Sequence, residues 1–413
     1  MSSSSSLHGP NTAPISASSN GNSNSSENND TVSDHHHVSV VIVGAGPSGI
    51  ATSALLNSYS VPNLVFERED CCASLWKKRS YDRLNLHLAK GYCSLPLMPH
   101  SFRTSTFMSK DDFIAYLDEY VSRFNVNPRY CRHVDSAVYD EDEEIWKVKV
   151  TGPDQYEYYS SDFLVVATGE NSQAIIPADL PGLESFTGKV VHACDYKNGE
   201  SFKDKQVLVI GCGNSGMEIS NDLADNGAHA SLVIRSQIHV LSKEMVAIGM
   251  LLLDYLPVKI VDKFVLFLAK FRYQDLSSYG IHHPDQGPFL FKALTGKTPV
   301  IDRGTINKIR SKQIKVFPGI VRINSNSVEF NNGARQSFDA ILLATGYKSV
   351  AHKWLKDYKY LLNDDGKPKG NYPNHWKGEK GVYCVGLAGN GLPGIFKDST
   401  AVAEDIYSLM AQK

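Results

Sequence analysis

The chain has 413 residues, of which 42% are hydrophobic and 21% charged, and its formal net charge at pH 7 is −2. This length allows two domains of ordinary size. The near-neutral charge argues against a nucleic-acid-binding protein, because such proteins concentrate basic residues on one face. The seven cysteines are scattered and form no C-x-x-C pair, so we expect a reducing compartment and no metal site.

The first 37 residues are rich in Ser and Asn and contain no Lys or Arg. Because they cannot bury a core, we expect a disordered tail. The segment has neither the basic start nor the apolar stretch of a secretory signal, and its acidic residues argue against a transit peptide. The histidines at 35–37 could bind a metal, but we interpret them as incidental.

The fold is predicted to begin at Val38, where VSVVIVGAGPSGIATSALLN indicates a buried strand, a glycine turn and a helix. In G-x-G-x-x-G loops, the glycines permit the tight turn, the close approach of a pyrophosphate and the packing of the helix. The loop residues that match this pattern are Gly44, Ala45, Gly46, Pro47, Ser48 and Gly49. A second strand ends at Glu67, which can accept hydrogen bonds from a ribose diol and would repel a 2′-phosphate. We therefore predict that this loop binds FAD or NAD, with Arg68 beside the cofactor.

A second unit of the same kind begins near Gln206, with the sequence QVLVIGCGNSGMEISNDLADNG. Its predicted cofactor-binding residues are Gly211, Cys212, Gly213, Asn214, Ser215 and Gly216. Here the strand ASLVIRS ends at a basic residue, Arg235, whose guanidinium can pair with the 2′-phosphate of NADP. The two loops thus differ in the feature that distinguishes their ligands.

The segment 245–271 is markedly apolar but is interrupted by Pro257 and several charges, so it is too broken for a spanning helix. We interpret it as two short buried helices, in preference to a contact with a membrane surface.

Two similar strands flank the second glycine unit: DFLVVATG at 162–169 and DAILLATG at 339–346. We infer an α/β fold with two dinucleotide-binding Rossmann-like domains, in which the NADP domain is inserted into the FAD domain. The expected parts are 38–170 and 330–413 for the FAD domain and 171–329 for the NADP domain.

The sequence between the two loops resembles a known family. Phe186-Thr-Gly188-Lys-Val-Val-His192-Ala-Cys-Asp-Tyr196 matches F-x-G-x-x-x-H-x-x-x-Y, the identifying motif of flavin-containing monooxygenases. Further segments are similar to the plant YUCCA branch of that family: SLWKKRSYDRLNLHLAK at 74–90, ATGEN at 167–171, TGKTPVIDRGT at 297–305, LLATGY at 342–347 and GVYCVG at 381–386.

This resemblance implies an enzyme that uses FAD, NADPH and O₂ to form a flavin C4a-(hydro)peroxide. In the YUCCA branch it implies oxidative decarboxylation of indole-3-pyruvate to indole-3-acetate, the auxin. Another 2-oxo acid, or N- or S-oxygenation of a soft nucleophile, remains the alternative. A cytoplasmic protein is expected, with the surface of the endoplasmic reticulum as a second location.

The resemblance also suggests site residues. His87 occupies the position near the reactive flavin edge where the wider family has Asn, and a buried structural histidine is the alternative. Asn171 either touches cofactor or caps a turn, and Trp76 packs near the cofactor or in the core. We expect His192 to be structural, in a linker between the domains.

Two other classes share parts of this pattern. A flavin disulfide reductase also has two glycine loops, but it needs a redox cysteine pair that this chain lacks. A non-catalytic NADPH-binding protein has no support in the sequence, because both loops are intact.

Overall fold

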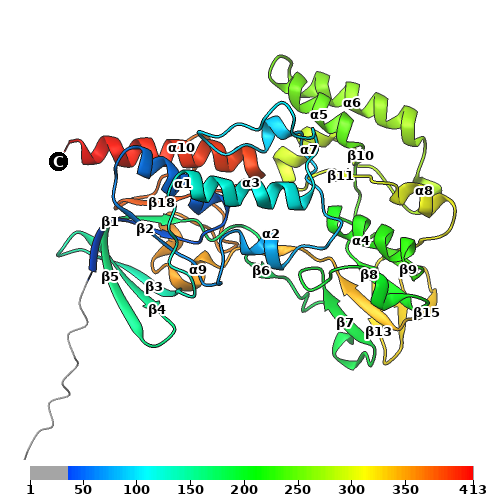
Figure 1. Ribbon diagram of the computed structural model, residues 1–413. Coiled ribbons are helices and arrows are strands. Elements are labelled where there is room, and N and C mark those ends of the chain that lie inside the picture. The colour runs from blue at the N-terminus through cyan, green and yellow to red at the C-terminus, as the bar shows by residue number, and fades with distance from the viewer. Residues whose placement is uncertain (1–35, 413) are drawn as a thin grey trace, which may run out of the picture. The chain divides into compact units, whose positions relative to one another are not determined.

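The computed structural model describes residues 36–412, which belong to one compact unit containing two large β-sheets (Figure 1). The predicted tail therefore lies almost entirely outside the described residues. Its last two residues, His36 and His37, correct that prediction, because they open strand β1 (His36–Val43). They pair with residues 159 and 160 of a neighbouring strand. The backbone hydrogen bonds of the ladder thus extend beyond the apolar run from which the strand was predicted.

The first sheet combines a parallel part with an antiparallel part. Strands β1, β2, β5 and β18 run parallel, and β3, β4 and β5 form an antiparallel meander. The sheet order is β2-β1-β5-β4-β3, with β18 also paired to β5. The bounds are β2 Asn63–Phe66, β3 His133–Asp140, β4 Ile145–Thr151, β5 Tyr156–Val166 and β18 Val382–Cys384.

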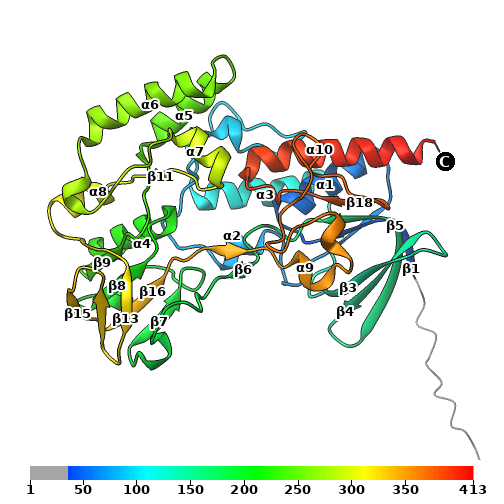
Figure 2. The ribbon, with the colours of Figure 1, turned by 180° about the vertical axis from the view of Figure 1, so that it is seen from behind.

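Helices cover one face of this sheet and share a core with it. They are α1 (Pro47–Ser58), α3 (Lys110–Arg123) and α10 (Gly391–Met410) (Figures 1 and 2). The short helix α2 (Ser74–Lys78) packs next to α3, and α9 (Ala351–Trp354) contacts β3 on the opposite face. Helix α10 lies directly against α1, so helices from the beginning and the end of the described chain form one layer on this sheet.

The second sheet is wholly parallel, with the order β12-β9-β8-β16-β7. Its strands are β7 Lys189–His192, β8 Gln206–Ile210, β9 His229–Val233, β12 Lys315–Phe317 and β16 Ala340–Leu343. All four residues of β16 are buried, as are the last four of β8. Parallel strands need cover on both faces, which explains these uninterrupted apolar runs.

The two faces of the second sheet have different covers. Helices α4 (Asn214–Asp225) and α8 (Thr305–Arg310) pack on one face, together with the helical segment that lies between them in the chain. That segment consists of α5 (Lys243–Leu253), α6 (Val258–Tyr273) and α7 (Pro288–Thr295), and the strands β10 (Val240–Leu241) and β11 (Val300–Ile301) flank it. A three-stranded antiparallel sheet covers the other face, formed by β13 Ile320–Ile323, β14 Ser327–Phe330 and β15 Arg335–Ser337.

The chain crosses between the sheets twice, and the two crossings lie side by side. Strand β6 (Gln173–Ala174) leads to the second sheet, and β17 (Tyr347–Lys348) leads back. The two strands pair antiparallel. This is the predicted insertion of one nucleotide-binding fold into the other.

The predicted boundary at residue 330 does not agree with the strand pairing. Strand β16 pairs with β7 and β8 of the second sheet, although residues 330–413 were predicted to belong to the FAD domain. The two ATG strands are therefore equivalent strands of two different domains, which explains their similar sequences. We propose that the FAD domain resumes near β17.

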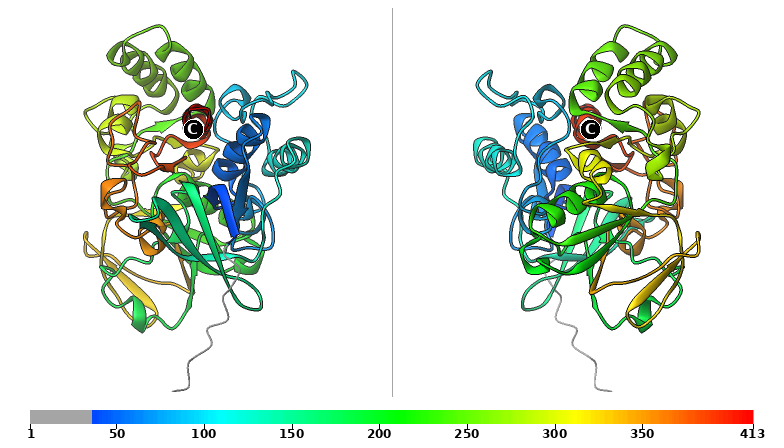
Figure 3. Two further views of the ribbon diagram at one scale, coloured as in Figure 1. Left: turned by 90° about the vertical axis from the view of Figure 1, so that its left-hand side faces the viewer. Right: turned by 90° about the vertical axis from the view of Figure 1, so that its right-hand side faces the viewer.

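The apolar segment 245–271 forms two short helices, α5 and α6, as predicted. The expectation that they are buried is wrong for one side of the pair. Figures 1 and 3 show both helices at the edge of the molecule, and several of their large apolar side chains are exposed.

Candidate functional site

The first glycine loop connects β1 to α1. Gly44 has a φ of +107°, and a Cβ atom there would lie 2.6 Å from the carbonyl oxygen of Ala167. A Cβ atom at Gly49 would overlap the backbone of Gly44, so this residue lets the helix approach the strand. A Cβ atom at Gly46 would meet nothing within 4 Å. The second glycine thus faces open space at the N-terminus of α1, where a phosphate group is favoured.

Glu67 follows β2 and lies beside this loop. Its carboxylate accepts hydrogen bonds from the backbone N–H of Ala45 at 2.8 Å and of Glu69 at 3.0 Å. Burial raises its pKa, and the two backbone hydrogen bonds oppose that rise. The structure therefore holds the carboxylate against the loop, as a ribose-binding acid requires.

A cavity of about 260 Å³ opens in front of the first loop. Of the residues predicted from sequence, its lining includes Gly44, Gly46, Pro47, Ser48, Glu67, Arg68, Trp76 and Asn171. Arg68 also donates to the carbonyl of Ser172 at 3.2 Å. Trp76 lies edge-on to Phe113, with ring centroids 4.7 Å apart, so it both lines the cavity and belongs to the core.

Two further groups of residues that line the same cavity were not predicted from the sequence. One is the turn after β5, with Thr168, Gly169 and Glu170, and the other follows β18, with Gly386, Leu392 and Ile395. Burial raises the pKa of Glu170. Because β5 and β18 are parallel neighbours, their carboxyl ends meet at one edge of the sheet, where ligands bind in such folds. The available signal was a glycine shortly after each strand, Gly169 after β5 and Gly386 after β18.

The second glycine loop, between β8 and α4, repeats the first in detail. Gly211 has a φ of +110°, and its position leaves no room for a Cβ atom because the carbonyl oxygen of Ala344 is too close. A Cβ atom at Gly216 would overlap the backbone of Gly211, and one at Gly213 would meet nothing within 4 Å. Ala344 follows β16 as Ala167 follows β5, so both ATG turns support a glycine loop.

Further groups hold the second loop. The side chain of Asn214 accepts a hydrogen bond from the backbone N–H of Ile301 at 2.7 Å, which joins the loop to β11. Burial raises the pKa of the Cys212 thiol, and the positive charges of Lys297 and Arg235 oppose that rise. Two cations therefore lie near the turn where an anionic pyrophosphate would be placed.

Arg235 is exposed and lies just beyond the end of β9. It lines a second cavity, of about 760 Å³, together with Lys312, Lys315 and His282. The cavity is thus rich in basic groups at the position where the sequence predicts the 2′-phosphate. The two lysines were missed because they are far from the loop in sequence and only the pairing of β12 with β9 brings them close.

His87 lies away from the first cavity, at the junction between its own loop and helix α4. Its Nε2 is 2.5 Å from a carboxylate oxygen of Glu218, which is 4% exposed. Tyr81 donates to the other oxygen of that carboxylate at 2.8 Å. The imidazole of His87 and the phenol of Tyr81 therefore contact the two oxygens of one buried carboxyl group.

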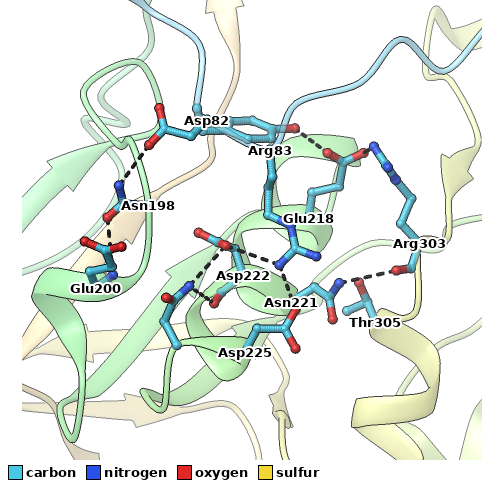
Figure 4. A network of polar contacts seen from close by, with 12 residues as sticks. Asp82, Arg83, Asn198, Glu200, Glu218, Asn221, Asp222, Asp225, Arg303 and Thr305 are labelled. Atoms are coloured by element: carbon cyan, nitrogen blue, oxygen red, sulfur yellow. Dashed lines mark hydrogen bonds and ion pairs between the residues drawn. The ribbon is translucent and has the colours of Figure 1, made fainter. Parts of the chain in front are cut away.

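Glu218 belongs to a polar network along α4 (Figure 4). Arg83 contacts Asp222 at 3.2 Å and Asp225 at 2.7 Å, and Tyr196 donates to Asp222 at 2.5 Å. The network joins the 80–90 loop and the F-x-G-x-x-x-H-x-x-x-Y motif to the helix of the second glycine loop. Sequence reasoning missed these acids, although they recur at four-residue and seven-residue spacing on one side of α4.

His192 lies at the end of β7, inside the second sheet and not in a linker between the domains. It is 6% exposed and its ring lies edge-on to Tyr347, with ring centroids 5.2 Å apart. Burial lowers its pKa. These contacts agree with a structural role.

Among the described residues, no group of three or more His, Cys, Asp or Glu side chains could hold a metal ion. All seven cysteines are free. Within the same residues, no helix is long and apolar enough to cross a membrane.

Comparison with known proteins identified several relatives. The model of the flavin-binding monooxygenase-like family matches residues 37–365. The chain is 53% identical to the probable indole-3-pyruvate monooxygenase YUCCA10 of Arabidopsis thaliana, over 90% of this chain and 98% of that protein. It is 44% identical to the indole-3-pyruvate monooxygenase YUCCA6 of the same plant, over 90% and 91% of the two chains.

Solved structures show the same fold at low sequence identity. A flavin-containing monooxygenase from Stenotrophomonas maltophilia superposes with a TM-score of 0.67 at 19% identity, over 91% of this chain and 99% of that one. An oxidised steroid monooxygenase bound to NADP superposes with a TM-score of 0.68 at 20% identity, over 91% and 86%.

Proposed function

Because the chain belongs to the flavin-binding monooxygenase-like family, we propose that it converts indole-3-pyruvate to indole-3-acetate by oxidative decarboxylation. The enzyme is an NADPH-dependent flavin monooxygenase with FAD and NADPH as its cofactors. The identity of the substrate is the part of this assignment that we propose. The observation that carries it is the similarity to YUCCA proteins over nine-tenths of the chain.

The two glycine loops fit the two cofactors. At Gly46 and Gly213 a Cβ atom would project into open space, as expected where a pyrophosphate lies against the backbone. We assign FAD to the first loop, because the buried Glu67 suits a bare ribose. We assign NADPH to the second, because Arg235 suits a 2′-phosphate.

FAD held by the first loop would supply the redox chemistry that links NADPH oxidation to the reduction of O₂. The overall reaction consumes one 2-oxo acid, one NADPH, one proton and one O₂. It yields the shortened acid, CO₂, NADP⁺ and one water, so one oxygen atom enters the organic product.

The protein's own part is placement and the exclusion of water. Leu75, Trp76, Leu392 and Ile395 give the first cavity apolar walls, which would exclude water from the reacting groups. Asn171, at the carboxyl edge of the sheet, offers amide donors to the cofactor or substrate. His87 contacts Glu218 of α4 and does not line the first cavity, so we propose that it acts as a positioning residue at the junction between the 80–90 loop and α4.

Product analysis tests this assignment. The purified holoenzyme would be supplied with NADPH and, separately, indole-3-pyruvate, phenylpyruvate and a soft amine. We expect stoichiometric indole-3-acetate and CO₂, with a higher kcat/KM for the indole substrate than for the phenyl one. Oxygenation of the amine without decarboxylation of either oxo acid would contradict the proposal and support the alternative chemistry.

A further inference from the structure

The hairpin of α5 and α6, residues 243–273, exposes an unusual amount of apolar surface. On α5 and the following turn, Ile248 is 43% exposed, Leu251 55% and Tyr255 78%. On α6, Ile260 is 54% exposed, Phe264 43%, Phe267 67% and Phe271 84%. Contiguous exposed patches of large apolar side chains are rare on proteins that lack a partner at that surface.

Helix α6 is apolar on two different sides. Val261 and Val265 are fully buried and face the rest of the protein. Ile260, Phe264, Phe267 and Phe271 follow the spacing i, i+4, i+7, i+11, so they form a single stripe on the other side. One apolar stripe is enough to attach a helix to its own domain. The second stripe therefore has another use.

Three lysines run along one edge of this stripe. Lys259, Lys263 and Lys270 each directly precede a member of it, and all three are exposed. The one acidic residue of α6, Asp262, is buried and turned inward, where it accepts from the backbone N–H groups of Phe289 and Leu290. The outer surface of α6 is thus cationic on a chain whose net charge is −2.

Another exposed aromatic residue lies on the loop next to the hairpin. Phe102 is 85% exposed, and its loop is held by Lys90, which donates to the carbonyls of Ser101, Phe102 and Thr104. The same loop contacts α5, because the ammonium group of Lys243 lies 4.5 Å from the ring centroid of Phe107. Figures 1 and 3 show this loop and the hairpin on the same side of the molecule.

We propose that the α5–α6 hairpin docks on the surface of an anionic lipid bilayer. The stripe of Ile and Phe would enter the boundary between headgroups and acyl chains, and the lysines along its edge would contact lipid phosphates. The helix axis would lie parallel to the membrane plane. This assignment reverses the preference drawn from the sequence, because the apolar stripe that was expected to be buried is exposed.

A second copy of the chain fits this surface less well. A symmetric dimer would place the patch against itself, so the three lysines would approach their own equivalents in the other copy. Like charges brought together in this way oppose association. Anionic headgroups supply the complementary charge, and a bilayer accommodates a convex helical edge without requiring a matching groove.

Vesicle co-sedimentation of the full-length holoenzyme tests the proposal. The probes are vesicles of phosphatidylcholine alone and vesicles that also contain about 30% phosphatidylserine. The anionic lipid gives the second set a negative surface potential. We expect the protein to bind the anionic vesicles. Changing Lys259, Lys263 or Lys270 to Gln should weaken partitioning about fivefold for each lysine replaced. The variant Phe267→Ser should weaken binding about tenfold.

Ile176→Ser is the matched control, because Ile176 is 66% exposed and Phe267 is 67% exposed. It should bind vesicles like the unchanged protein. Flavin content and melting temperature of each variant would show that it is folded. Absence of binding to anionic vesicles, or an equal loss in the control, would overturn the proposal. So would dimerisation of the unchanged protein without lipid that is abolished by Phe267→Ser.

Discussion

At the residue scale, the two proposed cofactor sites differ chiefly in one charged position. The backbones of the two loops match glycine for glycine, with φ values of +107° and +110° at Gly44 and Gly211. After the second strand of each unit the side chains differ, with a buried carboxylate at Glu67 and an exposed guanidinium at Arg235. This difference was visible in the sequence, because it depends only on which residue follows a strand.

Arg235→Ser should weaken NADPH binding selectively. A charge-assisted hydrogen bond contributes about 1.5–3 kcal/mol, so KM for NADPH should rise about ten- to a hundredfold. KM for NADH should hardly change, because NADH lacks the 2′-phosphate. Arg123→Ser, on the exposed end of α3, is the control. Since Lys312 and Lys315 line the same cavity, the triple variant should extend the loss. An unaltered preference in that variant would be incompatible with our placement of NADPH.

His87→Ala should divert NADPH electrons to H₂O₂, because loss of the His87–Glu218 contact would loosen the junction between the 80–90 loop and α4. Glu218→Gln should give a similar shift, since an amide cannot accept from Tyr81 and His87 in the same way. The measurement is the ratio of H₂O₂ to acid product across pH. Tyr81→Phe, which leaves the His87–Glu218 contact intact, is the control. A ratio that is unchanged in His87→Ala, with normal turnover, would assign His87 a structural role only.

At the element scale, the sequence predicted where strands lie in the chain better than it predicted which strands pair with one another. Both ATG strands were recognised, but the sequence alone placed the second one in the wrong sheet. The pairing of β16 with β8 and β7 depends on contacts between distant parts of the chain, which local patterns do not contain. Likewise, the apolar runs predicted α5 and α6 but not which side of them would stay exposed.

Asp262 illustrates how a charge within an apolar helix can be structural. Its carboxylate accepts from the backbone N–H of Phe289 at 2.9 Å and of Leu290 at 3.1 Å, at the N-terminus of α7. Loss of such a cap costs about 0.5–2 kcal/mol. We therefore expect Asp262→Ala to lower the urea midpoint of the second domain, and Asp262→Asn to lower it less. Equal stability of all three proteins would contradict this role.

At the scale of the whole molecule, the insertion of one domain into the other brings both loops and the network on α4 into one compact unit. The order of motifs along the chain was sufficient to predict this plan. Apart from Asn171, the cavity-lining residues of β12, of the segment after β18 and of the turn after β5 were not predicted, because strand pairing brings them there. The sequence raised a membrane-surface contact of 245–271 as the less favoured alternative, but it could not tell which side of the α5–α6 hairpin is exposed, since that depends on the packing of individual side chains.

A pair of matched variants tests most directly whether each loop holds its own cofactor. A Cβ atom is tolerated at both Gly46 and Gly213, so valine should leave the fold intact and fill the space meant for a pyrophosphate. The measurement is bound flavin per chain, together with the Kd for NADPH. Gly46→Val should lose FAD, whereas Gly213→Val should keep FAD and bind NADPH at least about tenfold more weakly. Full FAD occupancy in folded Gly46→Val, or loss of FAD in Gly213→Val with NADPH binding retained, would contradict the account.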